Sequence, residues 1–157
     1  MSDYFPMFFN IEGKQILIVG AGTIALRRIE TLLSFGVALT VAAPDCKDAV
    51  LEYAQAGKLQ YLDRGYHPDM LEKPYFMVIA ATDDFELNRK ICEDAREKTQ
   101  ALVNNAADKS QCDFYFPAIV REGDVIAGVC AGGKNHRLVR RAAAGMRSWL
   151  KQFMEQE

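Results

Sequence analysis

The chain has 157 residues, of which 50% are hydrophobic and 25% charged, with a formal net charge of −2. These values are typical of a folded protein with a sizeable core, and they exclude disorder and a basic nucleic-acid-binding surface. The apolar runs are far shorter than the roughly 18 residues of a membrane span, and the chain starts without an apolar leader, so we expect a cytoplasmic protein without a membrane partner.

Residues 15–28, QILIVGAGTIALRR, place a short apolar run before two glycines and a run with helical spacing. In such a unit Gly20 makes a tight turn, Gly22 lets the backbone approach a pyrophosphate, and Ala25 lets the helix pack closely on the strand. The N–H groups and dipole of the helix attract the phosphates. The pattern predicts a dinucleotide site, and the alternative is an ordinary turn whose glycines only provide positive φ.

The first hundred residues continue as alternating strands and helices. We expect strands at 37–43, 59–62, 75–81 and 101–103, and helices at 46–56 and from Asp83 or Asp84 to about Lys98. Strands separated by single helices form a parallel sheet with right-handed crossovers. The sequence therefore predicts an α/β fold with a Rossmann-like, doubly wound sheet.

The pattern changes after Asp108. Two β-rich runs at 113–121 and 125–131 predict an antiparallel hairpin with its turn at 122–124, and an amphipathic run after Gly132-Gly133 predicts a C-terminal helix. Because a hairpin edge can pair with a second subunit, we expect a homodimer. The expected division is a dinucleotide-binding domain at 1–108 and a dimerisation and substrate-binding region at 109–157.

Loops at the carboxyl ends of parallel strands meet around one crevice. Asp45 is placed to accept hydrogen bonds from a ribose diol, and no arginine adjoins it to hold a 2′-phosphate, which favours NAD over NADP; capping the next helix is the alternative. Thr82 and Asp83 can contact the cofactor, start a helix, or do both. Asn105 and Asp108 lie in the NNAAD loop, where a carboxylate near a nicotinamide ring can exchange a proton.

Motifs of hydrolases, kinases and zinc proteases are absent from the sequence, which leaves redox chemistry. We expect no metal site, because the cysteines and the two histidines lack the short ligand spacings of zinc sites. We expect no disulfides, and we expect most of Cys46, Cys92, Cys112 and Cys130 to be packed thiols in a reducing compartment.

A stretch without acidic residues runs from Gly132 to Lys151. It forms either an anion site or a solvated helix face. Its cations are Lys134, Arg137, Arg140, Arg141, Arg147 and Lys151.

Five segments resemble the precorrin-2 dehydrogenases of sirohaem synthesis, which occur alone, fused to a methyltransferase, or joined with ferrochelatase activity. The segments are FPMFFNIEGKQILIVGAGTIALRR (5–28), LTVAAPD (39–45), VIAATDD (78–84), NAAD (105–108) and DFYFPAIVREGDVIAGVCAGGK (113–134). The resemblance implies oxidation of precorrin-2 to sirohydrochlorin with reduction of NAD+. It places the catalytic aspartate of the N-x-x-D motif at Asp108 and cofactor positions at Thr23, Ile24, Pro44 and Asp45.

The implied substrate is a tetrapyrrole with eight carboxylates, which need cations nearby. We therefore expect Lys134, Arg137 and Arg141 to contact it. Three departures from the family pattern make chelatase activity the weaker expectation: Ala131 in place of serine, Asn135-His136 in place of Ser-Pro, and an end soon after Phe153. The alternatives are a bifunctional dehydrogenase and ferrochelatase, a dehydrogenase served by a separate chelatase, and a non-catalytic module that binds NAD(H) or tetrapyrrole. His136 is either a metal or substrate contact or a capping or surface group.

Overall fold

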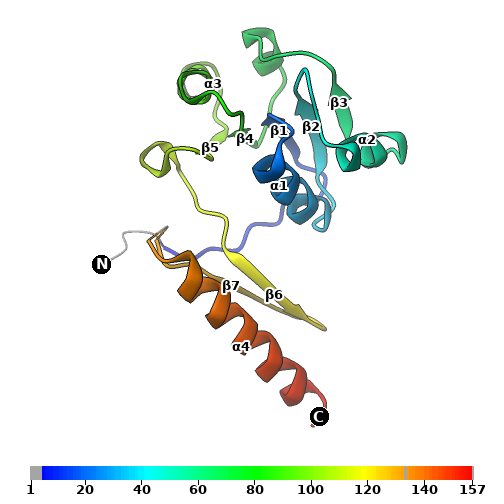
Figure 1. Cartoon of the computed structure of the whole chain (residues 1–157), viewed down its shortest axis with the longest axis vertical. Coiled ribbons are helices and arrows are strands. Elements are labelled where there is room, and N and C mark those ends of the chain that lie inside the picture. The colour runs from blue at the N-terminus through cyan, green and yellow to red at the C-terminus, as the bar shows by residue number, and fades with distance from the viewer. Residues whose placement is uncertain (1–4, 133, 157) are drawn as a thin grey trace. The chain divides into compact units, whose positions relative to one another are not determined.

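The computed structural model describes residues 5–132 and 134–156 (Figure 1). The chain divides into two compact units between Phe114 and Tyr115. The larger unit begins at Met7, and the smaller one also includes Phe5 and Pro6.

Five parallel strands form the sheet of the larger unit, in the order β3-β2-β1-β4-β5. This order places a topological switch point between β1 and β4, so the expected Rossmann-like fold is confirmed. The strands are β1 (Gln15–Val19), β2 (Ala38–Ala42), β3 (Gln60–Leu62), β4 (Met77–Ala80) and β5 (Leu102–Asn105). The connections hold α1 (Thr23–Leu33), α2 (Asp48–Gln55), α3 (Phe85–Lys98) and two 3-10 turns that we did not expect, η1 (Pro68–Glu72) and η2 (Lys109–Gln111).

The central strands form because nearly every residue in them is apolar. All four residues of β4 are buried, as are the last four of β1, which is typical of parallel strands covered on both faces. Helix α1 lies on one face of the sheet and α3 on the other (Figure 1), as right-handed crossovers in opposite directions require. On the α3 face, Val19, Val78 and Val103 pack with Ile91 and Cys92 of the helix.

Several expected element limits are wrong. Helix α2 begins at Asp48, because Lys47 is still extended and forms its N-cap. Strand β5 runs on to Asn105, since backbone pairing with β4 continues through both asparagines. The first strand of the hairpin begins at Ala118 and not at Asp113, whose carboxylate instead accepts a hydrogen bond from the N–H of Val103 at 2.8 Å.

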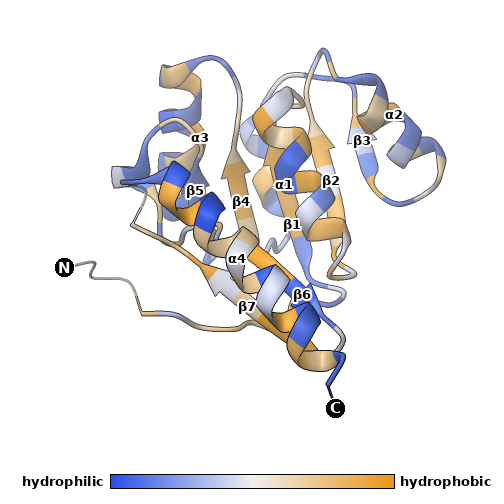
Figure 2. Ribbon diagram, turned by 60° about the horizontal axis from the view of Figure 1, so that its bottom comes forward, coloured by the Kyte–Doolittle hydropathy of each residue, from blue (hydrophilic) through white to orange (hydrophobic). Residues whose placement is uncertain are grey.

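In the smaller unit, β6 (Ala118–Glu122) and β7 (Val125–Val129) form the expected antiparallel hairpin, followed by α4 (His136–Met154). The turn has two residues, and Gly123 adopts a φ of 53° that suits a glycine-first hairpin turn. Val120 packs with Ala143 and Leu150 of α4. Figure 2 shows apolar residues along both strands and alternating apolar and polar residues along the helix. Gly133 of the predicted glycine pair lies outside the described residues.

No helix within 5–132 or 134–156 is both long and apolar enough to cross a membrane.

Candidate functional site

Strand β1 is followed by Gly20, which turns the chain toward α1. Its φ is 107°, a conformation that side chains disfavour. A Cβ at this position would overlap the carbonyl oxygen of Ala81 and lie 2.8 Å from the backbone nitrogen of Thr82. The N–H of Gly20 donates to the carbonyl of Ala42 at 2.8 Å. Gly20 is therefore required by its own conformation and by the close approach of the backbone after β4.

Neither backbone conformation nor a close neighbour requires a glycine at position 22. The φ of Gly22 is −78°, and a Cβ there would meet nothing within 4 Å. It is the N-cap of α1, a helix with no side-chain cap and no acidic residue in its first turn. The space beside the Gly22 Cα is therefore open, and the N-cap provides no side-chain acceptor for the backbone N–H groups of this helix end. Such a cradle fits the diphosphate of a dinucleotide, which provides both oxygen acceptors and negative charge.

The loop after β2 lies beside this turn, because the N–H of Lys47 donates to the carbonyl of Ala21 at 3.3 Å. The hydroxyl of Tyr61 donates to the carbonyl of Ala43 at 2.7 Å and fixes the start of the loop. Pro44 and Asp45 follow and are exposed. Helix α2 begins three residues after Asp45 and has no side-chain cap, so the capping alternative for Asp45 is wrong.

The loop after β4 is held by Asn88, which is fully buried. Its Oδ1 accepts from the N–H of Thr82 at 2.9 Å and from the Thr82 hydroxyl at 2.7 Å, and its Nδ2 donates to the carbonyl of Thr82 at 3.0 Å. Asp84, not Asp83, caps α3, by accepting from the N–H of Leu87 at 3.0 Å. The hydrogen-bonding groups of Thr82 are thus bonded to Asn88 within the loop, while Asp83 is exposed. We did not predict a role for Asn88, although an amide on the buried face of the expected helix was a signal.

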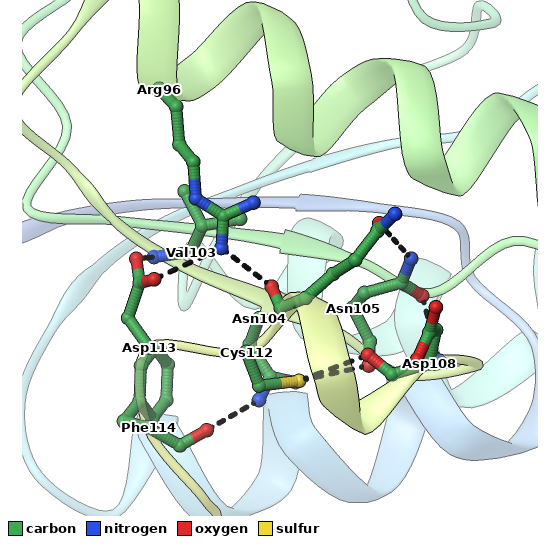
Figure 3. A network of polar contacts seen from close by, with 9 residues as sticks. Arg96, Val103, Asn104, Asn105, Asp108, Cys112, Asp113 and Phe114 are labelled. Carbon is green, nitrogen blue, oxygen red and sulfur yellow. Dashed lines mark hydrogen bonds and ion pairs between the residues drawn. The ribbon is translucent and has the colours of Figure 1, made fainter.

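Asn105 ends β5 and organises the loop that follows (Figure 3). Its side chain is only 2% exposed. Its Oδ1 accepts from the N–H groups of Ala107 at 2.9 Å and Asp108 at 3.2 Å, while its Nδ2 donates to Oε1 of Gln111 at 2.9 Å. These bonds give Asn105 a structural role in the loop, and its contact with a cofactor stays a prediction.

Asp108 is the N-cap of η2. Its Oδ1 accepts from the N–H of Ser110 at 2.9 Å and from the Ser110 hydroxyl at 2.7 Å. These hydrogen bonds stabilise the charged form and hold the pKa of the Asp108 carboxyl below its ordinary value. The group is therefore a carboxylate at neutral pH, ready to accept a proton.

The segment after η2 is fastened to β5 by side chains that periodicity does not reveal (Figure 3). The carboxylate of Asp113 accepts from Val103 and from Nη2 of Arg96 at 2.9 Å. Nδ2 of Asn104 donates to the carbonyl of Phe114 at 2.9 Å. The Cys112 thiol donates to the carbonyl of Asn105 at 3.2 Å. The Asp108 loop is therefore fixed at both of its ends.

The predicted substrate contacts belong to the smaller unit. Lys134, Arg137 and Arg141 are exposed, and the two arginines share a face of α4 because they are four residues apart. Asn135 caps the helix by accepting from the N–H of Leu138 at 2.9 Å, so His136 is not the cap, and its side chain is exposed at the surface.

All four cysteines are free thiols, but only Cys92 is buried, so the expectation that most of them are packed is wrong. Burial raises the pKa of the Cys92 thiol to about 12, and burial also raises that of Cys112. Among the described residues, no three histidine, cysteine or acidic side chains are placed to hold a metal ion.

A family model described as "Putative NAD(P)-binding" matches residues 7–118, from before β1 to the start of β6. The chain belongs to this NAD(P)-binding family. The match covers both the open glycine turn and the Asp108 loop.

Two similar proteins have names that refer to siroheme synthesis. The chain is 39% identical over 145 residues to the "Probable multifunctional siroheme biosynthesis protein HemA" of Ruminiclostridium josui, covering 91% of the chain and 28% of the relative. It is 36% identical over 138 residues to the siroheme synthase of Photorhabdus laumondii, covering 88% of the chain and 29% of the relative. The chain thus spans less than a third of the length of these relatives.

A solved structure, "SirC, precorrin-2 dehydrogenase", superposes with a TM-score of 0.79 at 26% identity. The superposition covers 92% of this chain and 70% of that one.

In this NAD(P)-binding chain the predicted residues of the larger unit gather at the carboxyl edge of the sheet. Gly20 and Gly22 follow β1, Asp45 follows β2, Asp83 follows β4, and Asp108 follows β5. At the opposite edge, a depression of about 770 Å³ is lined by residues that include Lys14, Tyr75, Phe76 and Lys98. None of the predicted site residues lines that depression.

Proposed function

We propose that this chain is an NAD-dependent precorrin-2 dehydrogenase, which oxidises precorrin-2 to sirohydrochlorin. The observation that supports the proposal is the presence, at one sheet edge, of an uncapped helix N-terminus for a diphosphate and of the Asp108 carboxylate, which accepts two hydrogen bonds from Ser110. The names of the siroheme relatives and of the SirC structure support the choice of substrate.

The reaction removes a hydride and a proton from precorrin-2. A bound nicotinamide would supply the hydride acceptor, with NAD+ reduced to NADH. The first-turn N–H groups of α1 would hold the diphosphate, and Asp45 would accept hydrogen bonds from the ribose hydroxyls. Asp108 accepts the proton, which balances the loss of two hydrogens from the substrate.

Cationic side chains are needed to bind the carboxylates of the proposed substrate. We assign Lys134, Arg137 and Arg141 to this role, because they are exposed and lie in a stretch free of acidic residues. The homodimer, the separate chelatase and the cytoplasmic location stay predictions.

Replacing Asp45 by serine is expected to weaken NAD+ binding about 10-fold or more, because hydrogen bonds to a charged acceptor contribute about 1.5–3 kcal/mol. The NADP+ to NAD+ affinity ratio should rise, since a carboxylate repels a 2′-phosphate. Calorimetric titration with both cofactors measures this change. Asp48→Ser, at another exposed acid of the same connection, is the matched control and should leave the ratio unaltered. An unchanged ratio in Asp45→Ser would remove the ribose role.

The function is tested by anaerobic incubation of the protein with precorrin-2 and NAD+. We expect sirohydrochlorin and NADH to form in equal amounts and the reaction to depend on the cofactor. If the folded protein binds both compounds without converting either, the alternative of a non-catalytic binding module is correct.

A further inference from the structure

The two oxygens of the Asp108 carboxylate have different surroundings. Both hydrogen bonds from Ser110, at 2.9 Å from its N–H and 2.7 Å from its hydroxyl, go to Oδ1. No protein group in the described part of the chain donates to Oδ2. One oxygen is thus held by the protein, and the other is open to a reacting group.

Ser110 is itself held in place, because the loop around it is closed by independent contacts. The side chain of Asn105 accepts from the N–H of Asp108 through Oδ1 and donates to Oε1 of Gln111 through Nδ2. The N–H of Gln111 donates to the carbonyl of Asp108 at 3.2 Å. The loop therefore fixes the position of Ser110 relative to Asp108, and with it the orientation of the hydrogen bonds to Oδ1.

We propose that Ser110 is a positioning residue: it fixes Oδ1 of Asp108 so that Oδ2 is the oxygen that receives the proton leaving the substrate. This inference rests on the proposed function. The same two bonds favour the ionised form of the carboxyl and lower its pKa.

The other titratable and charged groups near the loop do not control the protonation of Asp108. Cys112 is the titratable group that interacts with Asp108, and its thiol is kept neutral by burial. Asp113 is paired with Arg96 at 2.9 Å, Arg28 of α1 interacts with Cys112, and Lys109 is exposed. The hydrogen bonds from Ser110 are the largest influences on the protonation of Asp108.

Ser110→Ala removes the hydroxyl and keeps the backbone N–H, and the side chain is exposed, so the variant should fold. In the full chain, we expect the ¹³C NMR titration of the Asp108 carboxyl to move to higher pH. The kcat for precorrin-2 should fall about 10-fold, because the acceptor oxygen is less well oriented. The acid limb of the pH profile should move upward as well, since activity needs the ionised form and is lost as pH falls through the pKa. The dissociation constant of NAD+ should not change.

Ser110→Thr keeps the hydroxyl and is expected to restore the titration, the pH profile and kcat. A carboxyl titration unchanged in Ser110→Ala, or a shifted titration with wild-type kcat and pH profile, overturns the role of Ser110. Wild-type protein that binds NAD+ but does not oxidise precorrin-2 overturns the proposed function, and with it the proton transfer at Oδ2. An active wild type with an unaffected Ser110→Ala variant overturns the Ser110 inference alone.

Discussion

Replacing Asp108 by asparagine is expected to lower kcat for precorrin-2 oxidation by about 10²–10⁴-fold and to leave the melting temperature unchanged. Asparagine retains an oxygen that can accept from the N–H of Ser110, and it caps helical turns as well as aspartate does. The substitution removes the negative charge and the proton acceptor and preserves the shape. Anaerobic kinetics, together with calorimetric titration of NAD+, measure the effect.

Asp124→Asn is a suitable control, because Asp124 is an exposed acid in the hairpin turn of the smaller unit. It should keep wild-type kcat and the same affinity for NAD+. If Asp108→Asn were as active as this control, Asp108 would only cap η2, and the proton acceptor would have to be another group.

A single methyl group added at each glycine of the turn is expected to have different effects: at Gly20 it should lower stability, and at Gly22 it should lower the affinity for NAD+. Gly20→Ala should cost about 2–6 kcal/mol of folding free energy, since it combines a strained φ of 107° with overlap of the backbone at Ala81. Gly22→Ala should cost about 1 kcal/mol or less, because its Cβ has free space. It should nevertheless weaken NAD+ binding about 10-fold or more, as the methyl group occupies the space that the diphosphate needs. Denaturant unfolding and NAD+ titration separate the two effects.

Gly65→Ala provides the matched control for Gly22→Ala. Gly65 also lacks a positive φ and has nothing within 4 Å of its Cβ position, and it lies outside the predicted site. An NAD+ affinity that is equal in these two variants would show that the space before α1 is not where the diphosphate binds.

The sheet could be predicted because its signals are local. The apolar runs at 16–19 and 77–80 are buried on both faces, and each is followed by turn residues that end the strand. The limits of the last elements could not be predicted in this way. Asn104 and Asn105 belong to β5 through backbone pairing, and Asp113 is drawn to β5 by Val103 and Arg96, which are 10 and 17 residues away in the chain.

Candidate site residues could be predicted from the sequence where the residue type and its position after a strand suggest a role. Gly20, Asp45 and Asp108 follow strands and have conformational or hydrogen-bonding properties that suggest their roles. Asn88 and Ser110 do not, because their roles come from the groups that they face: the backbone of Thr82 and the carboxylate of Asp108. Only the folded geometry brings out such residues.

An NMR titration of the ¹⁵N-labelled chain with NAD+ tests the proposed dinucleotide site without any substrate. We predict that the amide resonances of Gly22, Thr23 and Ile24 shift in a saturable manner, together with those of the loop from Asn105 to Ser110. Those of Lys14 and Phe76, at the opposite edge of the sheet, should remain in place. Shifts confined to that opposite edge, with none at the glycine turn, would contradict the claim that α1 holds a dinucleotide next to Asp108.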